Sequence, residues 1–258
     1  MRLSDGRRSW FVKVNDAHRL AMFEAEAAGL AALAETRTIR VPRPLLTGVH
    51  QGQSYIVMEH IPMGRGSGSA LAAAGERLAA LHRHTADAFG WHRDNTIGST
   101  PQPNRWHADW IDFWRHERLG FQLELAARNG YGGALQRLGE RLLEKFPALL
   151  DHAPRPSLIH GDLWGGNLAF DDQNRPVIYD PATYYADREA ELAMTELFGG
   201  FGAAFYDAYQ AAWPLDPGYA SRKTLYNLYH ILNHANMFGG GYLGQAQRMM
   251  ERLLAELG

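Results

Sequence analysis

The sequence contains no cysteine, and this absence excludes disulfide bonds, thiolate metal ligands and cysteine nucleophiles. Because the fold must hold without disulfides, an intracellular setting is favoured, and we expect a cytoplasmic protein. The 12 histidines are scattered and include no H-E-x-x-H pair. The sequence therefore predicts no zinc site, and the histidines are interpreted as surface and capping residues.

The sequence also lacks a strong excess of either charge, since 26 Lys and Arg residues oppose 28 Asp and Glu residues. Proteins that bind nucleic-acid backbones without sequence preference carry a marked basic excess, so no nucleic-acid partner is expected. A local basic pocket is compatible with this balance. No run of about 18 apolar residues occurs, and the first 14 residues contain no apolar segment typical of a signal peptide, so no membrane partner is expected either.

Hydrophobic residues make up 46% of the 258 residues, which suffices for one large domain or for two lobes that share a cleft. Asp5-Gly6 lies between extended runs and predicts a hairpin over residues 1–14. A helix of about five turns follows, with Asp16 as its N-cap. Two more strands flank a turn at 50–53. Residues 1–61 are therefore predicted to form a small β-rich lobe with one helix.

Residues 62–69 are rich in Gly and Ser and are interpreted as a linker. Beyond them, residues 70–258 are predicted to form a larger, mainly helical lobe. Helices are expected over 70–85, 107–129, 132–147, 187–211, 218–236 and 242–257. The segment 85–104 shows neither helical nor strand periodicity and is predicted to be a long loop that reaches the cleft with Trp91, Asp94 and Asn95.

The stretch "SLIHGDLWGGNLAFDDQNRPVIYD" carries the residues that best indicate a reaction. His160, Asp162 and Asn167 have the H-x-D-x-x-x-x-N spacing of a phosphoryl-transfer loop, in which the Asp accepts the acceptor proton and the Asn holds a metal ion. The turn at 171–174 returns Asp180 beside Asn167 as a second oxygen ligand. We therefore expect ATP and Mg²⁺ as cofactors. The alternative is that these residues only form turns.

A nucleotide site also needs groups that hold phosphates and adenine. Lys13 lies in the apolar strand "WFVKV", where a lysine is costly unless it meets an anion. Glu26 is assigned as its partner because it shares a helix side with Phe23, and Glu24 is the rival. The backbone around Met58, Glu59 and His60, just before the linker, is expected to bind adenine.

This order of parts resembles the protein-kinase-like fold, and "HGD" in place of "HRD" is similar to the branch that contains aminoglycoside phosphotransferases and choline kinases. A closer resemblance, to the fructosamine (ketosamine) kinase family, spans nearly the whole chain. It rests on "FVKVN", "FEAEAAGL", "VPRPL", "FGWHRDNTIGSTPQPN", "DW", "LIHGDLWGGN", "VIYDPATYYADREAELAMTELFGGF" and "LYHILNH". The resemblance implies an α+β, bilobal fold and an ATP- and Mg²⁺-dependent kinase that phosphorylates a sugar hydroxyl of ketosamines.

The resemblance also implies roles for individual residues. The base would be Asp162, the metal ligands Asn167 and Asp180, and the phosphate-positioning pair Lys13 and Glu26. Candidates for acceptor binding are Trp164, Asp187 and His234, although Trp164 could be a core residue and Asp187 a helix cap. The short span between Asp180 and the helix near 187 leaves no room for a peptide-docking segment, which favours a small-molecule acceptor.

One departure from the pattern concerns the start of the small lobe. Kinase-like folds place a strand and a glycine-rich turn before the strands that lead to the lysine, but only 12 residues precede Lys13 and the hairpin at Asp5-Gly6 uses them. We therefore expect the first strand and the glycine-rich turn to be absent, and ATP binding and turnover to be weakened. The strand Met1–Ser4 would then be an open edge along which a second copy could pair to form a dimer.

Two alternative functions stay open on the sequence alone. The first is a kinase for another hydroxylated small molecule, such as an aminoglycoside or an amino alcohol. The second is a pseudokinase or interaction module that binds nucleotide without catalysis. The presence of Lys13, Asp162, Asn167 and Asp180 together argues against the second.

Overall fold

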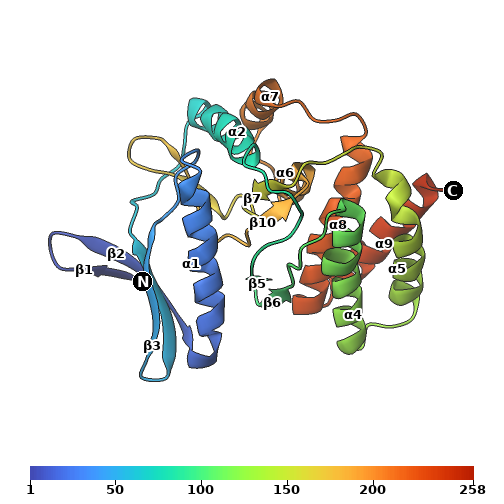
Figure 1. Cartoon of the computed structure of the whole chain (residues 1–258), viewed down its shortest axis with the longest axis horizontal. Helices are drawn as coiled ribbons and strands as arrows, with labels where there is room; N and C mark the ends of the chain where they lie inside the picture. Colours follow the sequence, from blue (N-terminus) through green and yellow to red (C-terminus); the bar gives the residue numbers. More distant parts are fainter.

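The N-terminal sheet is built on a strand with alternating burial. In the computed structural model, which describes all residues 1–258, β4 (Gln53–Glu59) buries Ser54, Ile56 and Met58 and leaves the residues between them more exposed. This period of two gives the sheet one core face. β4 pairs antiparallel with β2 (Ser9–Asp16) and β3 (Pro44–His50), and β1 (Arg2–Ser4) lies outside β2 (Figure 1).

Two tight turns join these strands as the sequence predicts. The Asp5 carboxylate accepts hydrogen bonds from the backbone N–H groups of Arg7 (2.9 Å) and Arg8 (2.6 Å), and Gly6 adopts a φ of 86°. Gln51 and Gly52 both have positive φ values, 48° and 79°. Positive φ at both central residues is the geometry that matches the twist of a two-residue hairpin.

The helix that covers the sheet, α1 (Leu20–Glu35), begins later than the sequence predicts. Asp16 caps nothing, because it still pairs with Gln53 at the end of β2 and its carbonyl accepts a hydrogen bond from the Ser54 hydroxyl. A short 3₁₀ turn, η1 (Ala17–Arg19), then leads into α1. The prediction of Asp16 as N-cap is therefore wrong: pairing within the sheet extends the strand through it.

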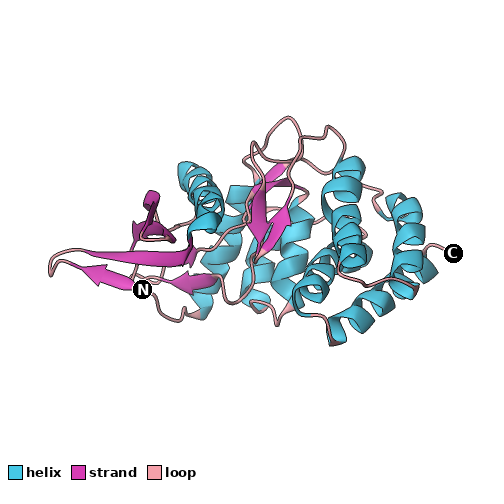
Figure 2. Ribbon diagram, turned by 90° about the horizontal axis from the view of Figure 1, so that it is seen from below, coloured by secondary structure: helices cyan, strands magenta, loops and turns pink.

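The C-terminal part is mainly helical, as predicted (Figure 2). Ser67 caps its first helix by accepting a hydrogen bond from the N–H of Ala70. The helical segments are α2 (Gly68–His82), α3 (Trp110–Phe113), the π-helical η2 (Trp114–Gly120), α4 (Phe121–Arg128), α5 (Ala134–Lys145), the 3₁₀ turn η3 (Phe146–Leu149), α6 (Arg188–Leu197), α7 (Ala203–Ala212), α8 (Tyr219–Phe238) and α9 (Gly241–Glu256). None of them combines the length and the apolar character needed to cross a membrane.

The single helix expected over 187–211 is two helices. Between α6 and α7, Gly199, Gly200 and Gly202 adopt φ values of 107°, 71° and 87°. Such values are outside the right-handed helical region and are readily available to glycine. The glycines therefore end α6 and let the chain turn into α7, which packs against α2.

The segment 85–104 also differs from its prediction as a loop without strands. It contains a small antiparallel hairpin, β5 (Asn95–Ile97) with β6 (Thr100–Gln102). The hairpin expected around 171–174 is present as β8 (Leu168–Phe170) and β9 (Pro176–Ile178). β7 (Ser157–Ile159) pairs with β10 (Tyr184–Ala186), a strand that the sequence did not predict.

The close approach of α2 to α7 depends on Gly75, because a Cβ there would lie 2.1 Å from the carbonyl oxygen of Phe205. Gly75→Ala should lower the free energy of unfolding by about 1–3 kcal/mol, although alanine is the better helix former. Urea unfolding measures this change. The control is Gly68→Ala in the same helix, where a Cβ would meet nothing within 4 Å; an equal effect of both changes would contradict the packing argument.

A second prediction concerns pH and His230 in α8. Burial, together with the positive charges of His234 and Arg118, lowers the pKa of His230 to about 3. As pH falls below about 6.5, the histidine becomes protonated in the unfolded chain but stays neutral in the folded protein. The native state therefore loses stability with a limiting slope of about 1.4 kcal/mol per pH unit. His230→Gln should flatten this loss between pH 6.5 and 4.5 in urea unfolding, whereas identical pH dependence would contradict it.

Candidate active site

The loop that carries the predicted catalytic residues leaves β7 and turns sharply at Gly161. This glycine has a φ of 86°, and a Cβ on it would lie 2.1 Å from the carbonyl oxygen of Ala182. The N–H of Ala182 in turn donates to the carbonyl of His160 at 2.9 Å. Only a glycine allows this close approach, so the second position of "HGD" holds the loop against the segment that follows Asp180.

His160 is a buried anchor of the loop. Its Nδ1 accepts from the N–H of Asp162 at 3.3 Å, and its Nε2 donates to the carbonyl of Tyr179 at 2.8 Å. Burial lowers the pKa of His160, which favours the neutral ring that this pattern of one acceptor and one donor requires. His160 thereby ties Asp162 to the residue that precedes Asp180.

Glu191 in α6 supports the same loop, and sequence reasoning missed it. Its carboxylate accepts from the N–H groups of His160 (3.0 Å) and Gly161 (2.7 Å) and bonds with Nε2 of His82 (2.9 Å). Burial alone would raise the pKa of Glu191, but the hydrogen bond and charge of His82, together with the interactions with His160, outweigh it and lower the pKa. The only available signal was an acidic residue at a position of α6 that faces the core.

Asp162 lies at the mouth of this loop in a largely desolvated setting. Burial and the negative charge of Asp180 raise its pKa to about 7. Asn167 donates from Nδ2 to the backbone carbonyl of Asp162 (2.8 Å) and to its Oδ2 (3.3 Å). This orientation fixes the carboxylate and leaves the amide oxygen of Asn167 as a free acceptor. A carboxylate with a raised pKa is suited to take a proton near neutral pH.

Asp180 meets the small lobe through Lys13. The Nζ of Lys13 lies 2.5 Å from Oδ1 of Asp180 and 2.7 Å from Oε1 of Glu26, so Glu26 rather than Glu24 is the partner from α1. Burial lowers the pKa of Lys13, but the two carboxylates raise it by more than burial lowers it, so the ammonium stays charged. Asp180 has a φ of 59°, a conformation that is costly for a residue with a side chain and common at functional sites.

These side chains line one cavity of about 340 Å³ between the lobes. Its lining includes Lys13, Glu26, Asp162, Trp164, Asn167, Asp180, and Asn95 and Thr96 from the β5–β6 hairpin. The free amide oxygen of Asn167 and the half-exposed carboxylate of Asp180 are hard oxygen donors. Such a pair fits Mg²⁺, which takes one or two protein carboxylates together with phosphate and water oxygens.

A second cavity of about 360 Å³ adjoins the first and shares Lys13 and Asp180 with it. Met58, Glu59 and His60, the predicted adenine-binding residues, all line it together with apolar side chains. The carboxylate of Glu59 bonds with Arg40 at 2.8 Å, and its N–H donates to the carbonyl of Arg43. The side chain of Glu59 is therefore engaged in an ion pair, and its contribution to the adenine cavity comes from its position at the end of β4.

The two aromatic candidates for acceptor binding lie in one row. Trp164 is 40% exposed and lines the first cavity, whereas His234 does not line it. Phe198, which the sequence did not single out, joins them: its ring centroid lies 6.3 Å from that of Trp164 and 5.1 Å from that of His234. The row leads from the cavity onto α8.

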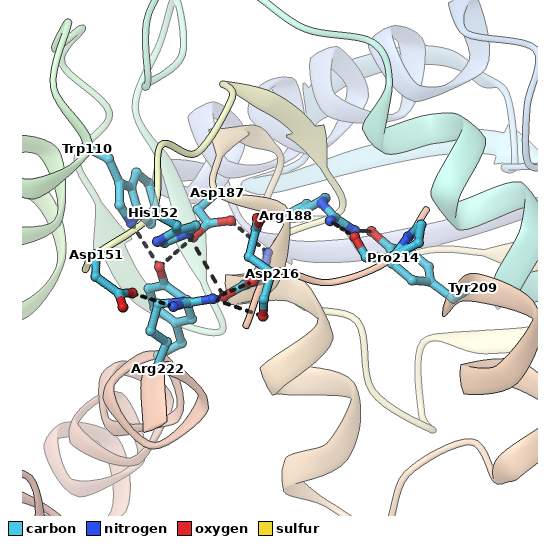
Figure 3. Close-up of polar contacts among 11 residues, drawn as sticks. Trp110, Asp151, His152, Asp187, Arg188, Tyr209, Pro214, Asp216 and Arg222 are labelled. Atoms are coloured by element: carbon cyan, nitrogen blue, oxygen red, sulfur yellow. Dashed lines mark hydrogen bonds and ion pairs between the residues drawn. The ribbon is translucent and has the colours of Figure 1, made fainter. Parts of the chain in front are cut away.

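Asp187 does not fit its predicted role in acceptor binding, because it lines neither cavity and is only 2% exposed. It caps α6 by accepting from the N–H of Glu189, and it also bonds with His152 and Tyr226 (Figure 3). Arg222 bonds both oxygens of Glu189 beside it. The capping alternative is therefore the one observed, and these carboxylates are already satisfied by protein donors rather than available to a metal ion.

The chain is similar to proteins of one family along nearly its whole length. The sequence profile of the family described as fructosamine kinase matches residues 1–256. The relative named "Probable ketoamine kinase" from Synechocystis is 53% identical over 254 residues, covering 98% of this chain and 85% of that protein. "Protein-ribulosamine 3-kinase, chloroplastic" from Arabidopsis thaliana is 48% identical over 254 residues, covering 96% of this chain and 77% of that protein.

Solved structures give the same result for the fold. A Haemophilus somnus protein assigned as a fructosamine-3-kinase superposes with a TM-score of 0.90 at 32% identity, covering 98% of this chain and 86% of that one. An aminoglycoside phosphotransferase in complex with ADP and hygromycin B reaches 0.62 at 16% identity, covering 99% and 92%. The second likeness concerns the fold alone. The protein-kinase-like, α+β fold predicted from the sequence is confirmed.

A prediction follows for Glu191. In Glu191→Gln, one side-chain oxygen becomes an NH₂ group that faces backbone donors, so we expect the free energy of unfolding to fall by about 1.5–3 kcal/mol. Amide hydrogen exchange at His160 and Gly161 should accelerate more than in the strands of the small lobe. The control is Glu140→Gln on the exposed side of α5. Unchanged exchange at both amides would contradict the role of Glu191 in holding the loop.

Proposed function

The chain belongs to the fructosamine kinase family, and from this membership we propose that it transfers the γ-phosphoryl group of ATP to a hydroxyl on the sugar part of a ketosamine. One observation carries the proposal: Lys13 from β2, Asp162 and Asn167 from one loop, and Asp180 after β9 line one cavity. These are the residue types that phosphoryl transfer requires. The relatives named as ketoamine and ribulosamine kinases support ketosamines as the acceptor class.

In the proposed reaction, Asp162 receives the proton of the acceptor hydroxyl as that oxygen attacks the γ-phosphorus. The new P–O bond forms while the bond from the γ-phosphorus to the bridging oxygen breaks, and ADP leaves with the electron pair. The hydrogen bonds from Asn167 hold the carboxylate of Asp162 in place. Its raised pKa makes it a better proton acceptor than an ordinary, fully solvated aspartate.

Charge neutralisation is the other requirement of the reaction. Lys13, held by Glu26, is proposed to contact the phosphates of ATP. Asn167 and Asp180 are proposed to hold Mg²⁺, which would neutralise charge that develops on the transferred group. Met58, Glu59 and His60 are proposed to enclose the adenine in the second cavity.

Trp164 is proposed to pack against the C–H face of the sugar, because its half-exposed ring lines the cavity beside Asp162 and aromatic faces suit that contact. His234 is proposed to contact a part of the acceptor that extends beyond the cavity, along the row of rings formed by Trp164, Phe198 and His234. Nothing in the cavity favours an aminoglycoside or an amino alcohol over a ketosamine. The cytoplasmic location, the lobe boundaries at 61/62 and 69/70, and a dimer through Met1–Ser4 stay predictions.

Asp162→Asn tests the proposed base. We expect kcat on a ketosamine to fall by about 10²–10⁴-fold, since this is the usual contribution of a general base, while ATP still raises the melting temperature. The control is Asp172→Asn in the exposed turn between β8 and β9, which should leave kcat unchanged. A wild-type rate in Asp162→Asn would remove the role assigned to this residue.

The acceptor class is tested by a screen for phosphate gain. We expect mass spectrometry to detect phosphorylation of ribulosamine, erythrulosamine or fructosamine adducts of lysine and simple amines in the presence of ATP and Mg²⁺. Aminoglycosides and amino alcohols serve as the comparison set. Gain on those compounds alone would reject the ketosamine assignment, and ATP binding without any turnover would favour a non-catalytic nucleotide-binding protein.

A further inference from the structure

A third cavity, of about 400 Å³, shares Glu59 with the adenine cavity and is rich in arginine. Five guanidinium groups line it, those of Arg37, Arg40, Arg43, Arg77 and Arg175. Three of them come from the connection between α1 and β3, Arg77 from the third turn of α2 and Arg175 from the turn between β8 and β9. The upper end of α1, α2 and the β8–β9 hairpin approach one another here (Figure 1). The whole chain has a net charge of −2, so this concentration of positive charge is local.

Two carboxylates, those of Glu59 and Asp171, offset part of this charge, and each already interacts with two of the arginines. Glu59 bonds with Nη2 of Arg40 at 2.8 Å and lies 3.9 Å from Nε of Arg43. Asp171 bonds with Nη1 of Arg40 at 2.5 Å and with Arg175 at 2.8 Å. Hydrogen bonds from both arginines and from backbone N–H groups hold the pKa of Asp171 well below its usual range, against the effect of desolvation. Arg40 and Arg175 are therefore neutralised within the protein.

The other three arginines have no close carboxylate. Arg37 makes no ion pair, Arg43 has only its long contact with Glu59, and Arg77 donates to the carbonyl of Thr38. Like charges gathered around one cavity repel one another and are stabilised by an anion. The guanidinium fork matches the oxygens of a phosphate group with two parallel hydrogen bonds.

We propose that this arginine cavity is a binding site for a small, soluble phosphate-bearing anion, separate from the ATP site. Its volume suits a compact group such as a mono- or diphosphate ester. Arg37 and Arg43 come from the small lobe, whereas Arg77 belongs to the large one. An anion held by all three would therefore link the two lobes behind the strand that borders the adenine cavity.

The probe for the experiment is inorganic pyrophosphate, titrated calorimetrically into the full chain without Mg²⁺ or nucleotide. Because pyrophosphate could also enter the ATP site, the titration is performed on Lys13→Ala, where that site has lost its phosphate-binding ammonium. We expect binding with one site per chain in Lys13→Ala, and at least a tenfold loss of affinity when Arg43→Gln and Arg77→Gln are added. In the otherwise unchanged chain, Arg43→Gln with Arg77→Gln should leave the KM for ATP unaltered.

The matched control is Arg137→Gln, an exposed arginine of α5 with no acidic partner, which should not change pyrophosphate affinity. Arg37→Gln provides an independent variant, since that side chain is exposed and makes no hydrogen bond or ion pair, and its melting temperature without ligand should match that of the unaltered chain. Affinity that disappears with Lys13→Ala, or that survives the loss of Arg37, Arg43 and Arg77, overturns the proposal.

A membrane lipid headgroup would offer the same phosphate chemistry. Co-sedimentation with vesicles of phosphatidylcholine and phosphatidic acid in equal parts distinguishes this source. Vesicle binding that depends on Arg37, Arg43 and Arg77, without binding of soluble pyrophosphate, overturns the proposal of a soluble ligand. Pyrophosphate binding without vesicle binding supports it.

Discussion

Lys13 joins the two lobes, because its ammonium contacts Glu26 in the small lobe and Asp180 in the large one. A lysine in an apolar strand is costly unless anions surround it, and here two carboxylates raise its pKa. The three side chains therefore stabilise one another only when α1, β2 and the end of the β8–β9 hairpin are correctly placed. The two cavities proposed for adenine and for phosphoryl transfer are both lined by Lys13 and Asp180.

Buried polar groups hold Asp162 in a fixed position relative to the contact between Lys13 and Asp180. The carboxylate of Glu191 accepts hydrogen bonds from backbone N–H groups of the loop, and His160 donates a hydrogen bond to the carbonyl of Tyr179, next to Asp180. Fully bonded polar groups in a low-dielectric interior are rigid, since any displacement leaves a buried donor or acceptor without a partner. The same tertiary packing that positions the loop also raises the pKa of Asp162, so the stability of the lobe and the chemistry of the site have a common origin.

The sequence predicted most of the residues that line the candidate site together, because its signals are local. The H-x-D-x-x-x-x-N spacing lies within eight residues, and the turn at 171–174 returns Asp180 over a short hairpin. The choice of Glu26 over Glu24 followed from helical periodicity. Glu191 and Phe198 were not predicted, since each acts across a contact with residues far away in the sequence. Asp187 was misassigned as an acceptor-binding residue because a charged residue at a helix start looks the same whether it faces a cavity or caps a buried turn.

By itself, the sequence determined the fold class, the hairpins with Asp5-Gly6 and Gln51-Gly52 at their turns, and the loop that carries Asp162 and Asn167. Backbone preferences of glycine and short-range spacing act before any tertiary contact forms. Only the tertiary structure decided that Asp16 stays in a strand, that Asp187 is buried, and that arginines from three segments surround one cavity. Each of these outcomes depends on which distant segments pack together, and the burial and electric field that result are properties of the whole fold.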